Sequence, residues 1–249
     1  FDEVIARLGQ QARVDGLIVV GSAAQEQLTA VSDYDLVIIL STMPVPLHVG
    51  MTYIDGRFAD LIFHTTDQVE QILAATTPFA FWDWVGRLVG WLATGKVVFD
   101  RQGQLGQAQA KVQSGAWLQP ISDRATYNAW QSINYNLQVV RRYLAAADPT
   151  YLLAADMRML LFGPQDLFFN YFTVRGLPPD SEKNSIRYLQ VHDPEYLTLF
   201  QRFLLETERQ AKFHYYEQVA MMTLAPVGGL WRTGETIMNI DAQVVTPAM

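Results

Sequence analysis

The stretch GLIVVGSAAQEQLTAVSDYDLVIIL, residues 16 to 40, decides how the rest of the chain is interpreted. It opens with an apolar run that ends at the small pair Gly21-Ser22, and it closes with a second apolar run. A polar interval separates the two runs, and Asp33 and Asp35 stand at the head of the second one. Short apolar runs bounded by small and polar residues are typical of strands. The stretch therefore predicts two strands that flank a turn.

The two aspartates are spaced for joint chemistry. In an extended chain successive side chains point to opposite faces, so Asp33 and Asp35 would lie side by side on one face. At about 4 Å and an effective dielectric near 20, two carboxylates repel by roughly 4 kcal/mol, which favours a bound proton or a shared cation. Paired oxygen ligands suit Mg²⁺, which usually takes one or two carboxylates together with substrate phosphates.

Gly21 and Ser22 suit the anion that such a metal would accompany. Glycine lacks a Cβ, so the backbone can approach a bulky anion closely at position 21. A helix that starts after Ser22 would also direct N–H groups at that anion. The two halves of the stretch together predict one site for a metal-bound polyphosphate.

The combination of Gly21-Ser22 with Asp33-Tyr34-Asp35 resembles the signature of the nucleotidyltransferase superfamily, whose fold is that of DNA polymerase beta-like nucleotidyltransferases. Members transfer a nucleoside monophosphate from a nucleoside triphosphate to an acceptor hydroxyl. The resemblance implies a third carboxylate on a later strand, and Asp60 in RFADLIF, residues 57 to 63, is the candidate. The resemblance covers residues 14 to 101, because GKVVFD, residues 95 to 100, is similar to the glycine-led strand that closes this domain in small-molecule members.

The chain departs from many antibiotic-modifying relatives at one point. These carry an arginine soon after the Gly-Ser pair, whereas Ala23-Ala24-Gln25 follows here, so another cation has to neutralise the phosphates. A tract from Phe169 onward resembles the part of the helical domain that faces the catalytic cleft in small-molecule members, which implies roles for Tyr171 and Lys183. A lysine in the first turn of a helix opposes the helix dipole unless an anion such as a phosphate compensates it. An ordinary exposed lysine is the alternative.

The resemblance thus implies a set of site residues and ligands. The expected catalytic residues and Mg²⁺ ligands are Asp33, Asp35 and Asp60. The residues expected to bind ATP, or another nucleoside triphosphate, are Gly21, Ser22, Tyr171 and Lys183. The implied acceptor is a small molecule, and the acidic charge of the chain favours a cationic one such as an aminoglycoside.

Composition narrows the classes of partner. The chain has 249 residues, a net charge of -7 and a pI near 5.0, and its longest basic cluster is the pair Arg141-Arg142. A broad nucleic-acid footprint is therefore not expected. Cysteine is absent, which excludes disulfides, thiolate nucleophiles and cysteine-based zinc sites. His64, His192 and His214 lack the spacing of metal ligands, and surface or capping roles are favoured for them.

The hydropathy of the chain indicates in which cellular compartment the protein is expected. No apolar run approaches the roughly 18 residues of a membrane span, and the opening FDEVIARLGQ lacks the apolar core of a signal peptide. These features predict a soluble cytoplasmic protein with no membrane partner. A homodimer stays open.

The pattern along the chain changes from strand-like to helical near residues 101 to 104. The expected fold class is α+β, with an N-terminal nucleotidyltransferase mixed sheet flanked by helices in residues 1–103 and a C-terminal all-α helical bundle in residues 104–225. Residues 226–249 are expected to form a C-terminal arm. Asp55-Gly56 favours a hairpin turn between two strand-like runs.

Four helical segments are expected in the bundle. Spaced apolar residues and proline-containing breaks define them. Gly163-Pro164 is expected to kink or split the second one. The segments are Asp123 to Ala147, Thr150 to Val174, Glu182 to Val191 and Pro194 to Leu224.

Three other interpretations stay open. A non-catalytic, antitoxin-like partner protein of the same fold is favoured by the missing arginine and opposed by the three retained carboxylates. A protein adenylyltransferase would use the same residues on a protein acceptor. The aspartates could also be strand-entry residues of an unrelated α/β domain, which explains each one singly but not their joint pattern with Gly21-Ser22 and Asp60.

Overall fold

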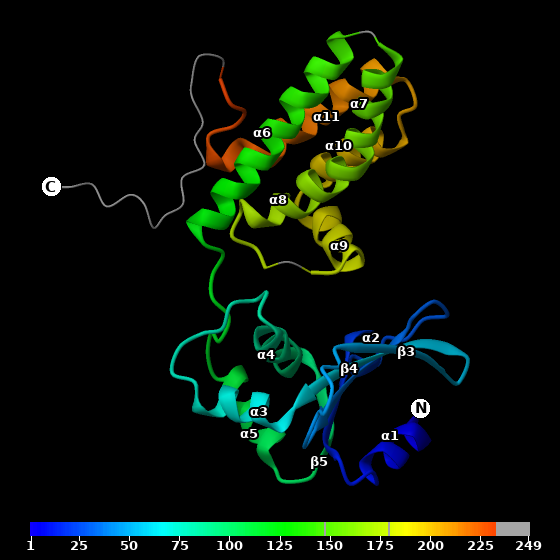
Figure 1. Ribbon diagram of the computed structural model, residues 1–249, viewed down its shortest axis with the longest axis vertical. Helices are drawn as coiled ribbons and strands as arrows, with labels where there is room; N and C mark the ends of the chain where they lie inside the picture. Colours follow the sequence, from blue (N-terminus) through cyan, green and yellow to red (C-terminus); the bar gives the residue numbers. More distant parts are fainter. Residues whose placement is uncertain (147, 179, 233–249) are drawn as a thin grey trace, which may run out of the picture. The chain divides into compact units, whose positions relative to one another are not determined.

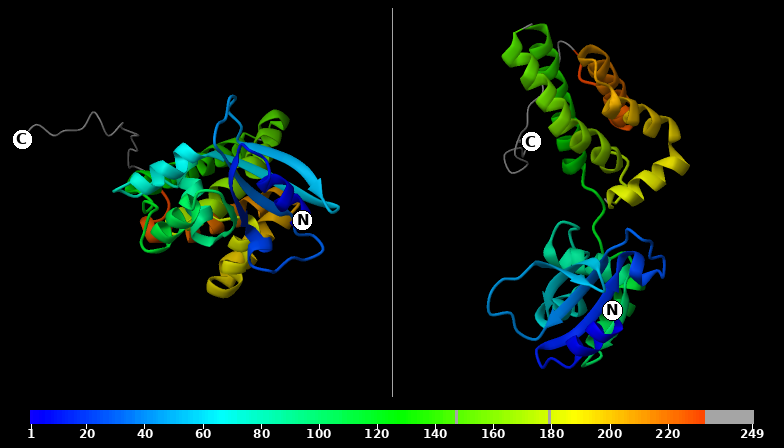
Figure 2. Two further views of the ribbon diagram at one scale, coloured as in Figure 1. Left: turned by 90° about the horizontal axis from the view of Figure 1, so that it is seen from below. Right: turned by 90° about the vertical axis from the view of Figure 1, so that its right-hand side faces the viewer.

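A computed structural model describes residues 1–146, 148–178 and 180–232 of the protein. Its contacts divide the chain into two compact units, the first from Phe1 to Gln119 and the second from Pro120 onward. Figures 1 and 2 show a sheet with helices in the first unit and helices alone in the second. The expected α+β class is therefore confirmed.

The first unit is built on a five-stranded sheet with the strand order β3-β4-β2-β1-β5. Strands β2 and β4 run parallel, and the other neighbours pair antiparallel, so the sheet is mixed as expected. The hairpin expected at Asp55-Gly56 joins β3 to β4, and both turn residues have positive φ. The strands are β1 (Val14–Val20), β2 (Tyr34–Leu40), β3 (Val49–Ile54), β4 (Arg57–Thr65) and β5 (Lys96–Asp100).

Helices cover both faces of the sheet (Figure 1). On one face, alternate strand residues such as Ile18, Val37 and Ile62 pack against α3 (Thr66–Ala74), α4 (Trp84–Thr94) and α5 (Gln104–Gln113). On the other face, residues such as Leu17 and Leu36 pack beneath α1 (Asp2–Gly9) and α2 (Gly21–Ala24). The alternation explains why these strands are apolar on both sides.

The division after Gln119 differs from the boundary expected after residue 103. Helix α5 buries Leu105, Ala108 and Val112 in the core between the sheet and its helices. The chain then returns to Phe79, whose backbone exchanges hydrogen bonds of 2.9 and 2.8 Å with Trp117 and Gln119. The strand signals stop near residue 101, but the core of the first unit continues for about one more helix.

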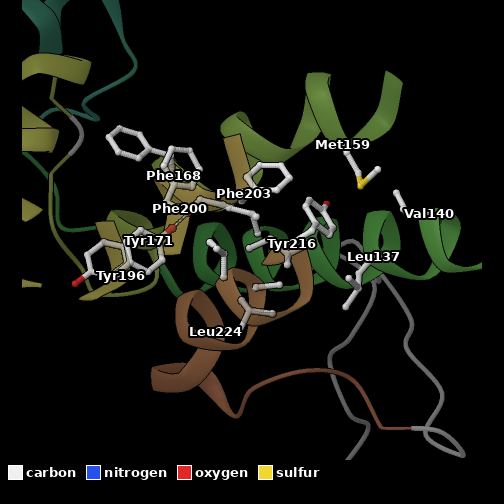
Figure 3. Close-up of a cluster of buried hydrophobic side chains, with 14 of the residues drawn as sticks. Leu137, Val140, Met159, Phe168, Tyr171, Tyr196, Phe200, Phe203, Tyr216 and Leu224 are labelled. Carbon is white, nitrogen blue, oxygen red and sulfur yellow. Dashed lines mark hydrogen bonds between the residues drawn. The ribbon is translucent and has the colours of Figure 1, made fainter. Parts of the chain in front are cut away.

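The second unit is a helical bundle, as expected. Buried aromatic and aliphatic side chains such as Tyr196, Phe203 and Leu137 form its core (Figure 3). The proline at the start of α7 and α10 occupies the first helical turn, where its missing N–H costs nothing. The helices are α6 (Asp123–Ala145), α7 (Pro149–Phe162), α8 (Asn170–Thr173), α9 (Glu182–His192), α10 (Pro194–Leu205) and α11 (Arg209–Leu224).

Two breaks in the bundle test the expected segments. The second segment is interrupted at Gly163-Pro164 as predicted, by a π-helix from Gly163 to Phe169. The prediction of one helix from Pro194 to Leu224 is wrong, because the chain unwinds between α10 and α11. There the carboxylate of Glu206 accepts bonds from two backbone N–H groups, and that of Glu208 caps α11. The arm expected at 226–249 lies outside the described residues from 233 onward.

None of the helices formed by the described residues combines the length and the apolar character that a membrane crossing requires.

His64 on β4 is fully buried, so the surface or capping role favoured for it is wrong. Its ring stacks on Trp84 and meets the edge of Trp91, and Nδ1 lies 2.8 Å from Oε1 of Gln68. Burial lowers the pKa of His64 from 6.5 to about 4. The folded protein therefore holds this imidazole neutral at pH values where the unfolded chain would protonate it.

Replacing His64 by phenylalanine should flatten the acid dependence of stability. Below pH 6.5 the imidazole of His64 binds a proton in the unfolded wild type, but in the folded state it does so only below about pH 4. Stability therefore falls as the pH falls through this window. The wild type should lose about 2 kcal/mol more than His64→Phe between pH 7 and pH 4.5. Urea unfolding of both proteins at the two pH values measures this, and equal losses would contradict it.

Candidate active site

Asp35 and Asp60 lie next to each other across the sheet. They are direct partners in the parallel ladder between β2 and β4, which sets their Cα atoms about 4.8 Å apart. Alternation places both carboxylates on the face that carries Val37 and Ile62, the face covered farther along by α3, α4 and α5. Both residues are only partly buried. The structure thus brings together two of the three predicted carboxylates at an accessible end of the sheet.

Gly21 brings the backbone against this pair. Val20 at the end of β1 is the antiparallel partner of Asp35, and the next residue, Gly21, has φ +64. A Cβ built on Gly21 would lie 2.6 Å from Oδ2 of Asp35. A side chain at position 21 would therefore meet both a backbone conformation that L-residues avoid and the carboxylate itself. Ser22 follows in the short helix α2 and is half-buried.

Asp33 is positioned differently. It precedes the first residue of β2, so the strand register that aligns Asp35 with Asp60 does not extend to it. Across the described part of the chain, no three histidine, aspartate or glutamate side chains are placed to hold one metal ion. The three carboxylates Asp33, Asp35 and Asp60 are accordingly not gathered into the three-ligand group that the sequence predicted, and a shared metal stays a prediction.

Arg57 holds the loop that leads into Asp33. Its guanidinium Nη1 donates to the carbonyl oxygens of Thr29 at 2.6 Å and Ser32 at 3.0 Å, and it lies over the ring of Tyr34 at 5.9 Å. Arg57 begins the strand that carries Asp60, so it connects the two acidic segments of the site. Sequence reasoning missed this residue, because no local pattern indicates a contact across 25 or more positions.

The alanines that replace the expected arginine have a packing role. Ala23 and Ala24 contact the apolar side chains of the sheet face that α1 covers. The nearest basic position on β5 is Lys96, the ladder partner of Val19, and its Nζ lies 3.9 Å from Glu26. Because Val19 belongs to the α1 face, Lys96 stands on the opposite side of the sheet from the two carboxylates.

Tyr171 lies in the core of the second unit. Its hydroxyl donates to Oδ2 of Asp193 at 2.8 Å, and the guanidinium of Arg175 sits 3.6 Å from the ring centroid. Burial and the bond to Asp193 raise the pKa of Tyr171 to about 12, so the hydroxyl stays protonated. These contacts give Tyr171 a role inside the bundle, and nucleotide binding by it stays a prediction.

Lys183 is in the first turn of α9, as its position in the sequence predicted, and its side chain is exposed. Ser181 caps this helix by accepting from the N–H of Asn184 at 3.4 Å. The helix end is therefore stabilised by its own cap, and phosphate binding by Lys183 stays a prediction.

No family model and no curated protein matches the chain. Among solved structures it is similar to a nucleotidyltransferase-like protein from Exiguobacterium sibiricum 255-15, with 14% sequence identity and a TM-score of 0.43. That alignment covers 90% of this chain and 76% of the other.

Proposed function

We propose that the protein transfers a nucleoside monophosphate from a nucleoside triphosphate to a hydroxyl group of a small molecule. The observation that supports this most directly is the pairing of Asp35 with Asp60, with Gly21 in close contact with the Asp35 carboxylate. This arrangement agrees with the signature that the sequence resembles. It offers oxygen ligands and an approachable backbone within one end of a sheet.

The donor set suits Mg²⁺. This ion usually takes one or two carboxylates and fills its other positions with water and substrate phosphates, so two paired aspartates are enough. Asp35 and Asp60 would hold it, with Asp33 at the edge of the site. When bound, the ion would neutralise charge on the phosphates of the nucleotide.

The residues of the chain have separate roles in the proposed reaction. Gly21 and Ser22 bind the phosphates through backbone N–H groups and a hydroxyl. Asp60 accepts the proton of the acceptor hydroxyl, whose oxygen bonds to the α-phosphorus of the triphosphate. The bond from that phosphorus to the bridging oxygen breaks, pyrophosphate leaves, and Asp60 returns the proton to solvent. ATP is the proposed donor.

Loss of either paired carboxylate should remove transfer activity. With radiolabelled ATP, Mg²⁺ and a panel of acceptors that includes aminoglycosides, Asp35→Asn and Asp60→Asn should each be at least about 100-fold slower than wild type. Both changes keep the shape of the side chain, so circular dichroism should show folded protein. Chelation of divalent ions should have the same effect on the wild type.

Asp83→Asn is a matched control. Asp83 is exposed and is the N-cap residue of α4, but its side chain accepts no capping hydrogen bond. This variant should keep wild-type activity. If Asp35→Asn and Asp60→Asn transfer label as fast as Asp83→Asn, or if the wild type transfers none to any acceptor, the proposed function is wrong.

A further inference from the structure

Strand β3 carries an exposed apolar strip. It is the edge strand of the sheet, and on one of its faces Val49, Met51 and Tyr53 follow each other at every second position. Met51 and Tyr53 are 75% and 73% exposed. A solvent-facing side of an antiparallel pair normally carries polar residues, and a run of exposed apolar residues marks a place where something binds.

The strand register puts this strip beside the paired carboxylates. Met51 is the direct partner of Asp60 in the antiparallel ladder between β3 and β4, and Tyr53 is the partner of Phe58. Side chains of direct partners have Cβ atoms about 5 Å apart on the same face. The rings of Tyr53 and Phe58 meet edge to face with centroids 5.9 Å apart. We call Met51, Tyr53 and Phe58 the apolar shelf.

The chemistry of the shelf selects a kind of ligand. A thioether and two aromatic rings offer flat, polarizable contacts that suit the face of a ring. A polycationic sugar would instead need carboxylates beyond the two that the proposed metal uses, and the shelf residues flanking Asp60 carry no charge. The shelf is thus suited to a flat apolar group placed next to Asp60.

We propose that the apolar shelf binds the ring of the acceptor, so that the acceptor is a small aromatic alcohol or phenol and not a polycationic sugar. This inference rests on the proposed function, because it places the hydroxyl group of the ring-containing acceptor next to Asp60, the carboxylate that accepts its proton. The oxygen of this hydroxyl group forms the new bond to the α-phosphorus, and pyrophosphate leaves as described above.

Methionine methyl groups provide a direct readout of binding. The chain has 8 methionines, and Met51 can be assigned in a ¹³C-methyl spectrum by comparison with Met51→Leu. Titration with tyrosol, an uncharged phenol with an alcohol side chain, should shift the Met51 signal upfield in a saturable way. Met157, which is 52% exposed on α7, should not move. Titration with 2-deoxystreptamine, a cationic ring alcohol, should leave Met51 unchanged.

Two variants of the same strand separate the shelf from the rest of the surface. Tyr53→Ala should weaken tyrosol binding by about 10-fold, because it removes one ring of the shelf. Thr52→Ala should bind as wild type, because Thr52 is exposed on the opposite face of β3. Equal binding by the two variants, an equal shift at Met157, or a larger shift with 2-deoxystreptamine would overturn the proposal.

Kinetics distinguish failure of the shelf from failure of the proposed reaction. With ATP and Mg²⁺, Tyr53→Ala should raise KM for tyrosol while kcat stays near wild type, whereas Asp60→Asn should lose kcat. Saturable binding at Met51 without any transfer would refute the proposed reaction. Transfer to tyrosol with the same KM in Tyr53→Ala and wild type would refute the shelf. A dimer that Met51→Lys dissociates in sedimentation would assign the strip to a second copy of the chain, which would also overturn the proposal.

Discussion

Replacing Gly21 by alanine is expected to lower kcat for the proposed nucleotidyl transfer by roughly 100-fold, a cost that moving a catalytic group by about 1 Å can have. The new Cβ would lie 2.6 Å from Oδ2 of Asp35, so the carboxylate has to rotate or the end of β1 has to shift. The left-handed backbone at Gly21 adds about 1 to 2 kcal/mol of destabilisation for any L-residue. Activity should therefore fall far more than stability.

Gly103→Ala isolates the steric part of this effect. Gly103 precedes α5 with φ +75, and a Cβ there would have nothing within 4 Å. It should show a loss of stability similar to that of Gly21→Ala with wild-type kcat. Urea unfolding and label transfer measured on both variants provide the comparison. Parallel losses of activity in the two variants would show that the contact with Asp35 has no special role.

Replacing Gly86 by alanine is expected to give the largest loss of stability. A Cβ on Gly86 in α4 would lie 1.9 Å from the carbonyl oxygen of Ala80, which is backbone and cannot rotate away as a side chain does. The helix would have to move off the segment before it, at a cost of about 3 kcal/mol, the upper end for overpacked sites. This movement would also weaken the packing of α4 on β1 and β4.

Gly90→Ala makes the opposite prediction in the same helix. A Cβ on Gly90 meets nothing within 4 Å, so alanine there should stabilise the protein by about 0.5 to 1 kcal/mol through helix propensity. Tryptophan fluorescence follows unfolding of the first unit, which holds four of the six tryptophans. A Gly86→Ala protein as stable as Gly90→Ala would show that α4 does not pack as described.

The strands that frame the site could be predicted because their signals are local. The apolar run before Gly21, the run after Asp35 and the Asp55-Gly56 turn correspond to β1, β2 and the β3–β4 hairpin within one or two residues. Period-2 alternation and turn residues with positive φ depend only on neighbours in the chain. The same local reasoning located the interruption at Gly163-Pro164.

The arrangement of these elements could not be predicted in the same way. The amphipathic pattern of α5 shows which residues are buried but not which core receives them, and Leu105 and Val112 belong to the first unit. The break between α10 and α11 contains neither glycine nor proline, and it depends on backbone bonds to Glu206 and Glu208. Bonds of this kind compete with the helix without changing the hydrophobic pattern.

The arrangement of the candidate site could not be predicted from local sequence patterns either. The sequence indicated Asp35 and Asp60 as ligands, but their direct pairing follows from the parallel register of β2 and β4, which no turn specifies. The position of Met51 opposite Asp60 also depends on register. A strand-like run before Asp55-Gly56 was expected from the sequence, but only the sheet order shows that this strand, β3, is an edge.

The contacts of α5 also bear on how such a chain can recombine with others. Lys111 donates to the carbonyl oxygens of Leu73 at 2.7 Å and Ala75 at 2.6 Å, so α5 closes the end of α3 as well as covering the sheet. A gene crossover after residue 103 would deliver a sheet lacking one of three covering helices. A crossover after Gln119 would transfer an intact module. The inheritable unit of this architecture is therefore longer than its strands suggest.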